Sequence, residues 1–331
     1  MLYHFLGKTG VKVSEICLGT MTFGGDSDEK TSAEVYRYSC EAGINFFDCA
    51  DVYVGGRSEE LLGEFMRGHR DEVVLATKAY FSTGDDVNAS GSSRRHLMQS
   101  VEGSLRRLGT DRIDLFYLHR FDETTPLEES LRALDDMIRQ GKILYLGASN
   151  FAAWQVEKGL GLAARQNWTR FECIQPMYNL VKRQAEVELL PMALAEGLSV
   201  FPYSPMGGGL LSGKYGTKKR PESGRLVESE MYAERYGAEW IYRTAGEFTA
   251  LAERHGYPPA ALAVAWVGSH PAVTAPIIGA RTLDQLKQTL AAVDIEMTAD
   301  LRAEISRLSP EPPPATDRNE ERSSKTFGVR K

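Results

Sequence analysis

Four polar residues in this sequence could act together on protons: Asp48, Tyr53, Lys78 and His119. Each lies at or just beyond the end of a short apolar run, in the contexts NFFDCADVY, VVLATK and LFYLH. A phenol, with an ordinary pKa of about 10, releases its proton reluctantly near neutrality, and a nearby ammonium lowers that pKa. A carboxylate would hold the ammonium, and an imidazole could hydrogen-bond the group that receives the proton. If these side chains meet, they form a proton-donating site.

Each of the four residues also has a simpler structural explanation. A tyrosine in a loop is usually a half-buried aromatic side chain, and an aspartate after a strand usually caps a turn or helix. A lysine after a strand often reaches for water, and a histidine there is often a satisfied structural group. The structural explanation is favoured for each residue taken alone, so the argument for chemistry depends on their joint occurrence.

The strands that must gather these residues can be read from eight short, almost entirely apolar runs. Such runs are typical of parallel strands covered on both faces, and helical patterns separate them. We expect one (β/α)8 TIM barrel, whose strand ends share one face. The alternative, an open doubly wound sheet, should carry GxGxxG after an early strand, and the sequence has none. The predicted strands are Ile16–Leu18, Asn45–Asp48, Val73–Thr77, Leu115–His119, Ile143–Ala148, Cys173–Gln175, Ser199–Pro202 and Ala275–Ile278.

Helix starts and irregular segments complete the expected architecture. We predict one domain over residues 1–309, with an N-terminal β-hairpin closing the bottom of the barrel, a long loop at 206–240, and a Pro-rich, charged tail at 310–331. The expected helix starts are two capping boxes, Thr31 with Glu34 and Thr125 with Glu128 behind Pro126 at the first helical position, then Ser58, and a late helix near Leu283.

Composition excludes several classes of protein. The 331 residues are 42% hydrophobic and 25% charged, with a net charge of −6, which argues against nucleic acid as a partner. No apolar run is long enough to cross a bilayer, and MLYHFLGKTG lacks the features of a signal peptide. The four cysteines form no CxxC pair and HExxH is absent, so we expect no metal. The GxSxG motif of hydrolases is also absent. A cytoplasmic protein without membrane partners is the expectation.

Several stretches, in this order, resemble the aldo-keto reductase family over nearly the whole chain: CLGTMTFGG, FFDCADVYVGGRSEELLGEF, ATK, YLHRFD, LGASNF, IQPMYNL, PYSPMGGGLLSGKY and PIIGARTLDQL. The likeness is nearer to the bacterial and potassium-channel β-subunit branch than to the aldose reductase branch. It implies a (β/α)8 barrel that reduces aldehydes or ketones with NADPH, NADH being the less favoured cofactor. It also implies a catalytic tetrad of Asp48, Tyr53, Lys78 and His119. The alternative is an NADP(H)-binding regulatory or redox-sensing subunit with slow turnover.

The same resemblance implies a set of cofactor-binding residues. Ser149, Asn150 and Gln175 would bind the nicotinamide carboxamide, and Tyr203 would stack on the ring. Alternatively, Ser149 and Asn150 simply cap the next helix, and both uses are compatible. The full set is Gly19, Thr20, Met21, Asp48, Ser149, Asn150, Gln175, Tyr203, Ser204, Pro205, Met206, Gly207, Lys214, Gly279, Arg281, Gln285 and Gln288.

The phosphate-binding part of that set needs a closer look. GGLLSGK fits the spacing of a nucleotide P-loop, but Tyr215 replaces the required Ser or Thr, so we reject an NTPase and expect Lys214 to contact the pyrophosphate. The guanidinium of Arg281 could form a forked pair of hydrogen bonds with a 2′-phosphate, or Arg281 could be an ordinary loop arginine. Thr289 stands where the family usually has Asn, which puts one adenine contact in doubt.

On the substrate side we expect an aromatic pocket for small carbonyl compounds. Arg120 would meet either an anionic substrate or a neighbouring acid. The physiological substrate and the oligomeric state are left open. The candidate pocket residues are Met21, Phe23, Tyr80, Phe81, Arg120 and Phe121.

Overall fold

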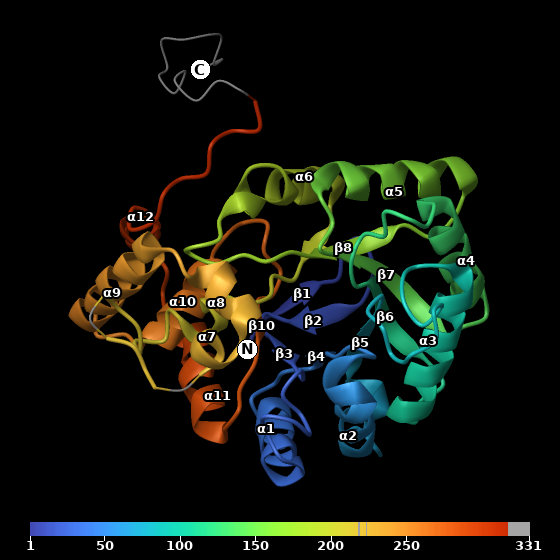
Figure 1. The fold of residues 1–331 in the computed structure, drawn as a ribbon, viewed down its shortest axis with the longest axis horizontal. Helices are drawn as coiled ribbons and strands as arrows, with labels where there is room; N and C mark the ends of the chain where they lie inside the picture. The colour runs from blue at the N-terminus through green and yellow to red at the C-terminus, as the bar shows by residue number, and fades with distance from the viewer. Residues whose placement is uncertain (218, 223, 317–331) are drawn as a thin grey trace.

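Eight parallel strands form the centre of the molecule (Figure 1), in a computed structural model that describes residues 1–217, 219–222 and 224–316. Neighbouring strands pair in the order β10-β3-β4-β5-β6-β7-β8-β9, so the order in the sheet follows the order in the chain. Each strand overlaps one of the eight predicted runs. They are β3 (Cys17–Gly19), β4 (Phe46–Asp48), β5 (Val74–Ala79), β6 (Ile113–Leu118), β7 (Ile143–Ser149), β8 (Phe171–Gln175), β9 (Ser199–Val200) and β10 (Ile277–Ile278).

Backbone hydrogen bonds join the two outer strands of this sheet. The N–H of Thr274 donates to Val200 O at 2.9 Å, and the N–H of Ile277 donates to Pro202 O at 2.9 Å. All residues of β4 and β5 are buried, as expected for strands enclosed on both faces. The predicted (β/α)8 barrel is confirmed.

An antiparallel hairpin of β1 (Tyr3–Phe5) and β2 (Lys12–Ser14) precedes the barrel, as predicted. The backbone N–H of Ser14 donates to the side chain of Asn45, just before β4, at 2.7 Å. The N–H of Gly7 donates to Ser199 Oγ, at the start of β9, at 2.8 Å. The hairpin therefore closes the N-terminal end of the barrel, opposite the strand ends that carry the four candidate residues.

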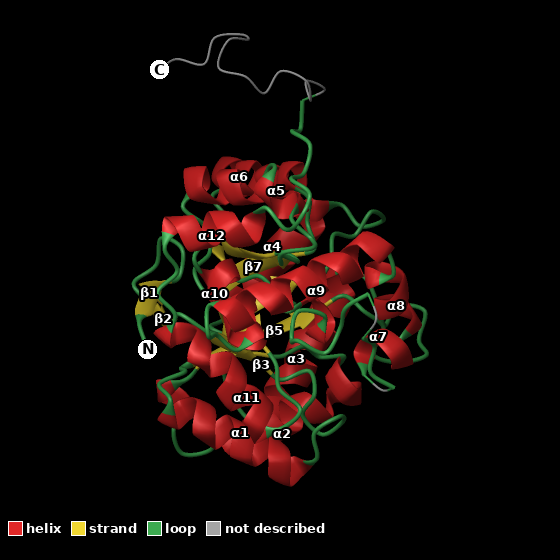
Figure 2. Cartoon of the chain, turned by 90° about the vertical axis from the view of Figure 1, so that its left-hand side faces the viewer, coloured by secondary structure: helices red, strands yellow, loops and turns green. Residues whose placement is uncertain are grey.

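Helices surround the sheet (Figures 1 and 2). Those in the first half of the chain follow the strands in alternation, and a cluster of additional helices lies in the second half. None in the described ranges is long and apolar enough to cross a membrane. Their bounds are α1 (Glu29–Glu41), α2 (Arg57–Phe65), α3 (Arg94–Leu108), α4 (Leu127–Arg139), α5 (Ala153–Gln166), α6 (Leu189–Glu196), α7 (Arg225–Glu228), α8 (Glu230–Tyr236), α9 (Glu239–Arg254), α10 (Pro259–Gly268), α11 (Leu283–Leu290) and α12 (Ala299–Ser306).

Both predicted capping boxes are wrong. Helix α1 starts three residues earlier than expected, because Asp28 is the N-cap and its carboxylate accepts the backbone N–H of Thr31 at 2.7 Å. Helix α4 follows Pro126, which has no side chain to cap it. The hydroxyl of Thr125 instead donates to Asp122 at 2.8 Å. A nearby acid takes the capping or hydrogen-bonding role in each case.

The other two expected helix starts agree more closely with the structure. Ser58 lies inside the first turn of α2, and the N-cap is Gly56 in a left-handed conformation (φ 95°), which a side chain would strain. Ser58 instead donates its hydroxyl to Thr20 O at 2.7 Å. Helix α11 begins at Leu283 as predicted, with the hydroxyl of Thr282 accepting the N–H of its third residue at 3.3 Å.

The segment at 206–240 is not the plain loop that we expected. It contains a short 3₁₀ turn, η4 (Gly207–Gly209), followed by α7 and α8. Leu226, Tyr232 and Tyr236 from these helices are buried in the main hydrophobic core. Of the predicted tail, residues 310–316 have no helix or strand, and residues 317–331 lie outside the described residues.

Candidate active site

Three neighbouring strands carry three of the four candidate residues to one end of the barrel. Asp48 is the last residue of β4, Lys78 is the penultimate residue of β5, and His119 follows β6 directly. Tyr53 opens a 3₁₀ turn, η1 (Tyr53–Gly56), five residues after Asp48. Because β4, β5 and β6 are adjacent and parallel, their ends lie side by side.

The ammonium of Lys78 is the centre of the cluster. Its Nζ lies 2.5 Å from Asp48 Oδ1, 2.6 Å from Cys49 O and 3.3 Å from Tyr53 OH, and the side chain is fully buried. The second oxygen of Asp48 accepts a hydrogen bond from the Gln175 side chain at 2.8 Å. The phenol, the amine and the carboxylate are therefore in direct contact, as the sequence suggested.

Protonation follows from burial and from these charges. Burial raises the pKa of Tyr53 to about 12; the charge of Lys78 lowers it only in part, and Asp48 raises it further. Lys78 thus acts in the expected direction but does not bring the pKa below its ordinary value. Burial lowers the pKa of Lys78, but Asp48 and Tyr53 raise it by more, so the net pKa is above the usual range. At neutral pH the site holds a protonated phenol beside a charged ammonium.

His119 completes the cluster as a neutral imidazole. Burial, and then the charge of Lys78, hold the pKa of His119 well below its usual value. Its ring lies edge-on to Tyr53, with centroids 6.1 Å apart, and to Phe81, at 4.9 Å. Nδ1 is buried and has no hydrogen-bond partner among the described residues. Since a buried, unpaired N–H costs more than an unpaired lone pair, we infer that the proton is on Nε2.

A cavity of about 660 Å³ opens above this cluster. Most of the predicted cofactor residues line it. Thr20 and Gly207 do not, and the Thr20 hydroxyl donates to Asp48 O at 3.2 Å. The predicted residues that do line it are Gly19, Met21, Asp48, Ser149, Asn150, Gln175, Tyr203, Ser204, Pro205, Met206, Lys214, Gly279, Arg281, Gln285 and Gln288.

A polar network crosses the floor of the cavity beside the cluster. Asn150 donates its amide to His119 O at 2.9 Å and accepts the hydroxyl of Tyr203 at 2.7 Å. Ser149 donates to Gln175 O at 3.1 Å. Asn150 and Ser204 both have φ 57°, a left-handed conformation that asparagine tolerates but that is unfavourable for serine. Backbone strain of the kind seen at Ser204 is common at functional sites.

The far end of the cavity is formed by the start of α11. Arg281 lies there with its guanidinium 2.9 Å from Asp26, and its backbone N–H donates to the Gln285 side chain at 3.0 Å. The hydroxyl of Thr289 donates to Gln285 O at 3.0 Å, inside its own helix, although Thr289 also lines the cavity. Arg281 therefore has an acidic partner that the sequence did not reveal.

Sequence reasoning missed the wall that the 206–240 segment contributes. Arg225, Met231, Tyr232 and Arg235 from α7 and α8 line the cavity. The available signal was the spacing of Tyr232, Arg235 and the buried Tyr236: they stand at positions i, i+3 and i+4, which lie on one side of a helix. Other missed lining residues include Thr22, Val52, Gly208, Gly209, Ser212, Tyr215, Gly224, Ala260 and Ala280.

Half of the expected substrate residues face the cavity. Met21, Phe81 and Arg120 line it, whereas Tyr80 and Phe121 do not. Phe23 was wrongly placed, because it is fully buried in the core. It packs edge-on to a phenylalanine of α2, with centroids 6.0 Å apart. Fewer aromatic side chains therefore line the cavity than the sequence predicted.

Comparison with known proteins agrees with this arrangement. The pattern of the Aldo/keto reductase family matches residues 15–310. The chain is 37% identical to an uncharacterized oxidoreductase of Bacillus subtilis (strain 168), over 94% of this chain and 97% of that protein. It is 32% identical to the versiconal hemiacetal acetate reductase of Aspergillus parasiticus, over 91% and 94%. It is 35% identical to a probable voltage-gated potassium channel subunit beta of Arabidopsis thaliana, over 89% and 92%. This chain therefore belongs to the Aldo/keto reductase family.

Proposed function

We propose that this protein reduces small aldehydes or ketones to alcohols with NADPH, and that Tyr53 donates the proton. The observation that carries the proposal is the contact between Tyr53 OH and Lys78 Nζ, 3.3 Å apart at the floor of a cavity. A phenol that is neutral at rest can give a proton, and an adjacent ammonium stabilises the phenolate that remains. Oxidoreductase activity of some kind is the general expectation for the family.

The cavity suits a dinucleotide in the chemistry and the charges of its lining. Amide and hydroxyl groups of Ser149, Asn150 and Gln175 lie near the tetrad and could bind a carboxamide. Lys214 and Arg225 form no ion pair among the described residues, so both are free to meet a pyrophosphate. The N-terminus of α11 favours a further phosphate.

The choice of NADPH over NADH rests on Arg281. Its guanidinium lies at the α11 end of the cavity and could make a forked contact with a 2′-phosphate. Asp26 competes for the same guanidinium. We therefore expect a preference for NADPH that is moderate rather than absolute.

Each residue of the tetrad has one task in the proposed reaction. The bound reduced nicotinamide supplies the hydride. Tyr53 gives its proton to the carbonyl oxygen, and Lys78 stabilises the phenolate. Asp48 fixes Lys78 by their 2.5 Å ion pair, and Gln175 fixes the other oxygen of Asp48. The Nε2–H of neutral His119 can hydrogen-bond the carbonyl oxygen and orient it.

A panel of aldehydes and ketones tests this proposal directly. The purified full chain is mixed with each carbonyl compound and either NADPH or NADH, and the loss of reduced-nicotinamide absorbance is followed. We expect multiple turnovers with NADPH and a higher KM for NADH. Arg281→Ala should weaken NADPH binding about tenfold and leave NADH binding nearly unchanged. Tight NADPH binding without turnover of any carbonyl would contradict the enzymatic proposal.

A second candidate function is a regulatory subunit that binds NADP(H) and turns over slowly. Its support is the similarity to the plant protein named as a probable potassium channel subunit beta. The intact contact between Tyr53 and Lys78 favours the enzyme, because a binding protein has no need for a proton donor. Rapid turnover with a simple aldehyde would exclude slow regulation as the main role.

A further inference from the structure

The cavity above the tetrad is cationic, although the protein as a whole has a net charge of −6. Its lining includes Lys214 and four arginines, and Asp48 is its one acidic residue among those described. Asp48 is already neutralised by Lys78. A concave surface with this surplus of positive charge attracts anions and raises their local concentration. The arginines are Arg120, Arg225, Arg235 and Arg281.

These cations divide between two ends of the cavity. At the α11 end, Arg281 and Tyr215 are neighbours, since the charge of Arg281 acts on the Tyr215 phenol. A side chain at Gly224 would lie 3.2 Å from Tyr215 OH, which brings the backbone of Arg225 near this end, but the Arg225 guanidinium lies over the ring of Tyr232 at 5.8 Å. Lys214 precedes Tyr215. The proposed dinucleotide phosphates therefore account for Lys214 and Arg281, and Arg225 lies between the two ends.

Arg235, on α8, lies over the ring of Tyr232 at 5.2 Å, and its charge acts on the phenol of Tyr203. The next residue, Tyr236, is tied to the cavity floor: Asn179 donates one amide to Tyr236 OH at 3.2 Å and to Ser204 O at 2.9 Å. Ser204 follows Tyr203, whose hydroxyl bonds Asn150. Arg235 is therefore near Tyr203, which is joined through Asn150 to the backbone of His119.

Arg120 reaches the same end from the opposite wall. It follows His119 directly and lines the cavity. Neither Arg120 nor Arg235 forms an ion pair with any carboxylate in the described part of the chain. Three exposed apolar side chains, Met21, Phe81 and Met231, line the cavity with them. The sequence left open whether Arg120 meets an acid of the protein or an anionic substrate, and the absence of a paired acid among the described residues favours the anionic substrate.

We propose that Arg235 and Arg120 make this protein selective for apolar carbonyl compounds that carry a carboxylate. The inference rests on the proposed reductase function and names its substrate class. A guanidinium binds a carboxylate through charge-assisted, often forked hydrogen bonds. Met21, Phe81 and Met231 would contact the apolar part of the substrate, and the carbonyl would point toward Tyr53 and His119.

The test compares a charged substrate with a neutral analogue of similar shape: 4-carboxybenzaldehyde and its methyl ester. We expect kcat/KM of the wild type to be about 10- to 100-fold higher for the acid, a difference that shrinks as salt is added. Arg235→Gln and Arg120→Gln should each lower kcat/KM for the acid about tenfold and change that for the ester less than about twofold. Arg243→Gln, an exposed arginine of α9 that does not line the cavity, is the matched control and should change neither.

Four outcomes would overturn the inference, and they differ in what they say of the proposed function. If the wild type reduces both compounds equally, the selectivity is refuted while the reductase function stands. If the variants lower both rates equally, the role of the two arginines in selectivity is refuted and the reductase function again stands. If Arg235→Gln weakens NADPH binding, measured by fluorescence titration, and spares the acid preference, Arg235 is a phosphate contact. If the wild type reduces neither compound nor any member of the carbonyl panel, both proposals fail.

Discussion

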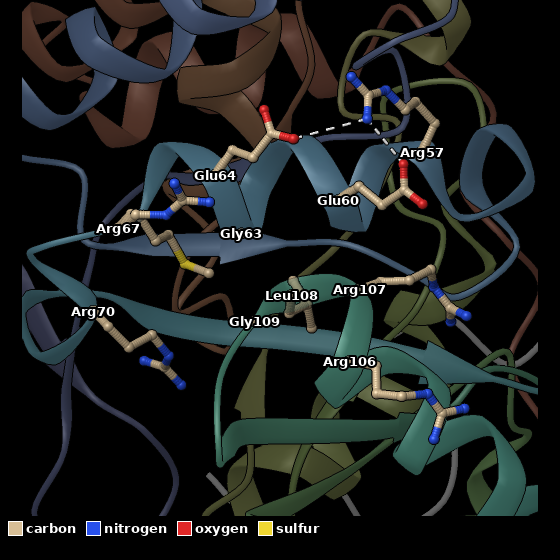
Figure 3. Close-up of a pocket in the computed structure, with 11 residues that line it drawn as sticks. Arg57, Glu60, Gly63, Glu64, Arg67, Arg70, Arg106, Arg107, Leu108 and Gly109 are labelled. Atoms are coloured by element: carbon tan, nitrogen blue, oxygen red, sulfur yellow. Dashed lines mark hydrogen bonds and ion pairs between the residues drawn. The ribbon is translucent and has the colours of Figure 1, made fainter.

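The cavity above the tetrad can be compared with a second cavity, of about 440 Å³, between α2 and α3 (Figure 3). This α2–α3 groove is also rich in arginine, yet most of its guanidiniums are paired. Arg57 lies 2.9 Å from Glu60, Arg70 lies 2.6 Å from Asp114, and Arg107 lies 2.7 Å from Glu59. Its residues are Arg57, Glu60, Gly63, Glu64, Met66, Arg67, Arg70, Arg106, Arg107, Leu108 and Gly109.

The difference between the cavities lies in where their charges find partners. In the α2–α3 groove the arginines connect helices to one another and to β6, which carries Asp114. The helices approach closely there, since a side-chain carbon at Gly63 would lie 2.4 Å from Leu108 O. In the tetrad cavity, Arg281 pairs with Asp26, but Lys214, Arg120, Arg225 and Arg235 form no ion pair among the described residues. A high density of charge therefore indicates a ligand site only where the charges are not already neutralised by the protein.

The largest expected effect separates chemistry from binding within the tetrad cavity. Tyr53→Phe removes only the hydroxyl, so it should lower kcat about 10³-fold, the usual range for a lost general acid. The dissociation constant for NADPH should change less than about threefold. Steady-state kinetics and a fluorescence titration measure the two quantities. A fully active Tyr53→Phe would refute the assignment of the proton donor.

A buried ion pair can be broken in each cavity to sharpen the comparison. Arg107→Met leaves Glu59, whose side chain is fully buried, without its partner. We expect it to lower the free energy of unfolding by about 3 kcal/mol. Activity per folded molecule should be unchanged. Lys78→Met should also destabilise the protein, because Asp48 loses its partner, but it should abolish activity as well.

Urea unfolding and kcat values corrected for the folded fraction test this pair of variants. Their stability losses should be similar and their activities should differ. If Arg107→Met lowered kcat as much as Lys78→Met, the α2–α3 groove would have a part in the reaction.

Asp51, between Asp48 and Tyr53, provides a pH-dependent test of the region that joins the two cavities. Burial raises the pKa of Asp51 to about 7, and Glu59 adds to this, while a hydrogen bond from Ser100 and the charge of Arg107 oppose it. An unfolded aspartate ionises near pH 4. Between about pH 4 and pH 7 the folded state therefore binds more protons, and stability falls as the pH rises through this window.

Asp51→Asn removes that titration and can still accept the hydrogen bond from Ser100. The variant should gain about 4 kcal/mol of stability relative to the wild type between pH 4 and pH 8, and the difference should level off above about pH 7. Thermal unfolding at a series of pH values measures it. Asp85→Asn, at an exposed acid, is the control and should show no such trend. A pH-independent difference for Asp51→Asn would mean that Asp51 is ionised throughout.

The smallest effect is expected at Arg106, which lines the α2–α3 groove, is exposed, and forms no ion pair among the described residues. Arg106→Met should change stability by less than about 0.5 kcal/mol and leave kcat/KM unchanged. Thermal unfolding and kinetics check both. A marked loss of activity would show that the groove binds something the reaction needs.

Features that depend on local sequence were predicted well. All eight strands were found because enclosed strands are apolar throughout, and the four candidate residues were predicted to meet because they follow those strands; the structure places them together. Helix starts failed where a competing side chain intervened: Asp28 precedes Thr31 as a cap, and Asp122 takes the hydroxyl of Thr125. Local sequence cannot show which of several polar groups wins such a competition.

Features that depend on long-range packing were missed. Phe23 follows a strand like the true cavity residues, but it packs into the core against α2. The ion pair between Arg281 and Asp26 joins residues at opposite ends of the chain. Arg235 was overlooked because the segment at 206–240 is rich in glycine and charge, so its two helices were not recognised. Only three residues of α7 and α8 are buried: Leu226, Tyr232 and Tyr236.

The contributions of the two halves of the barrel have a consequence for how such a protein can change over time. The proposed acid–base groups come from or next to adjacent strands, β4 to β6, in the first half of the chain, whereas α7, α8 and α11 supply walls of the cavity that would contact ligands. Mutations in the later segments can thus alter what is recognised while the reactive groups stay in place. New specificities can evolve on an unchanged reaction, one segment at a time.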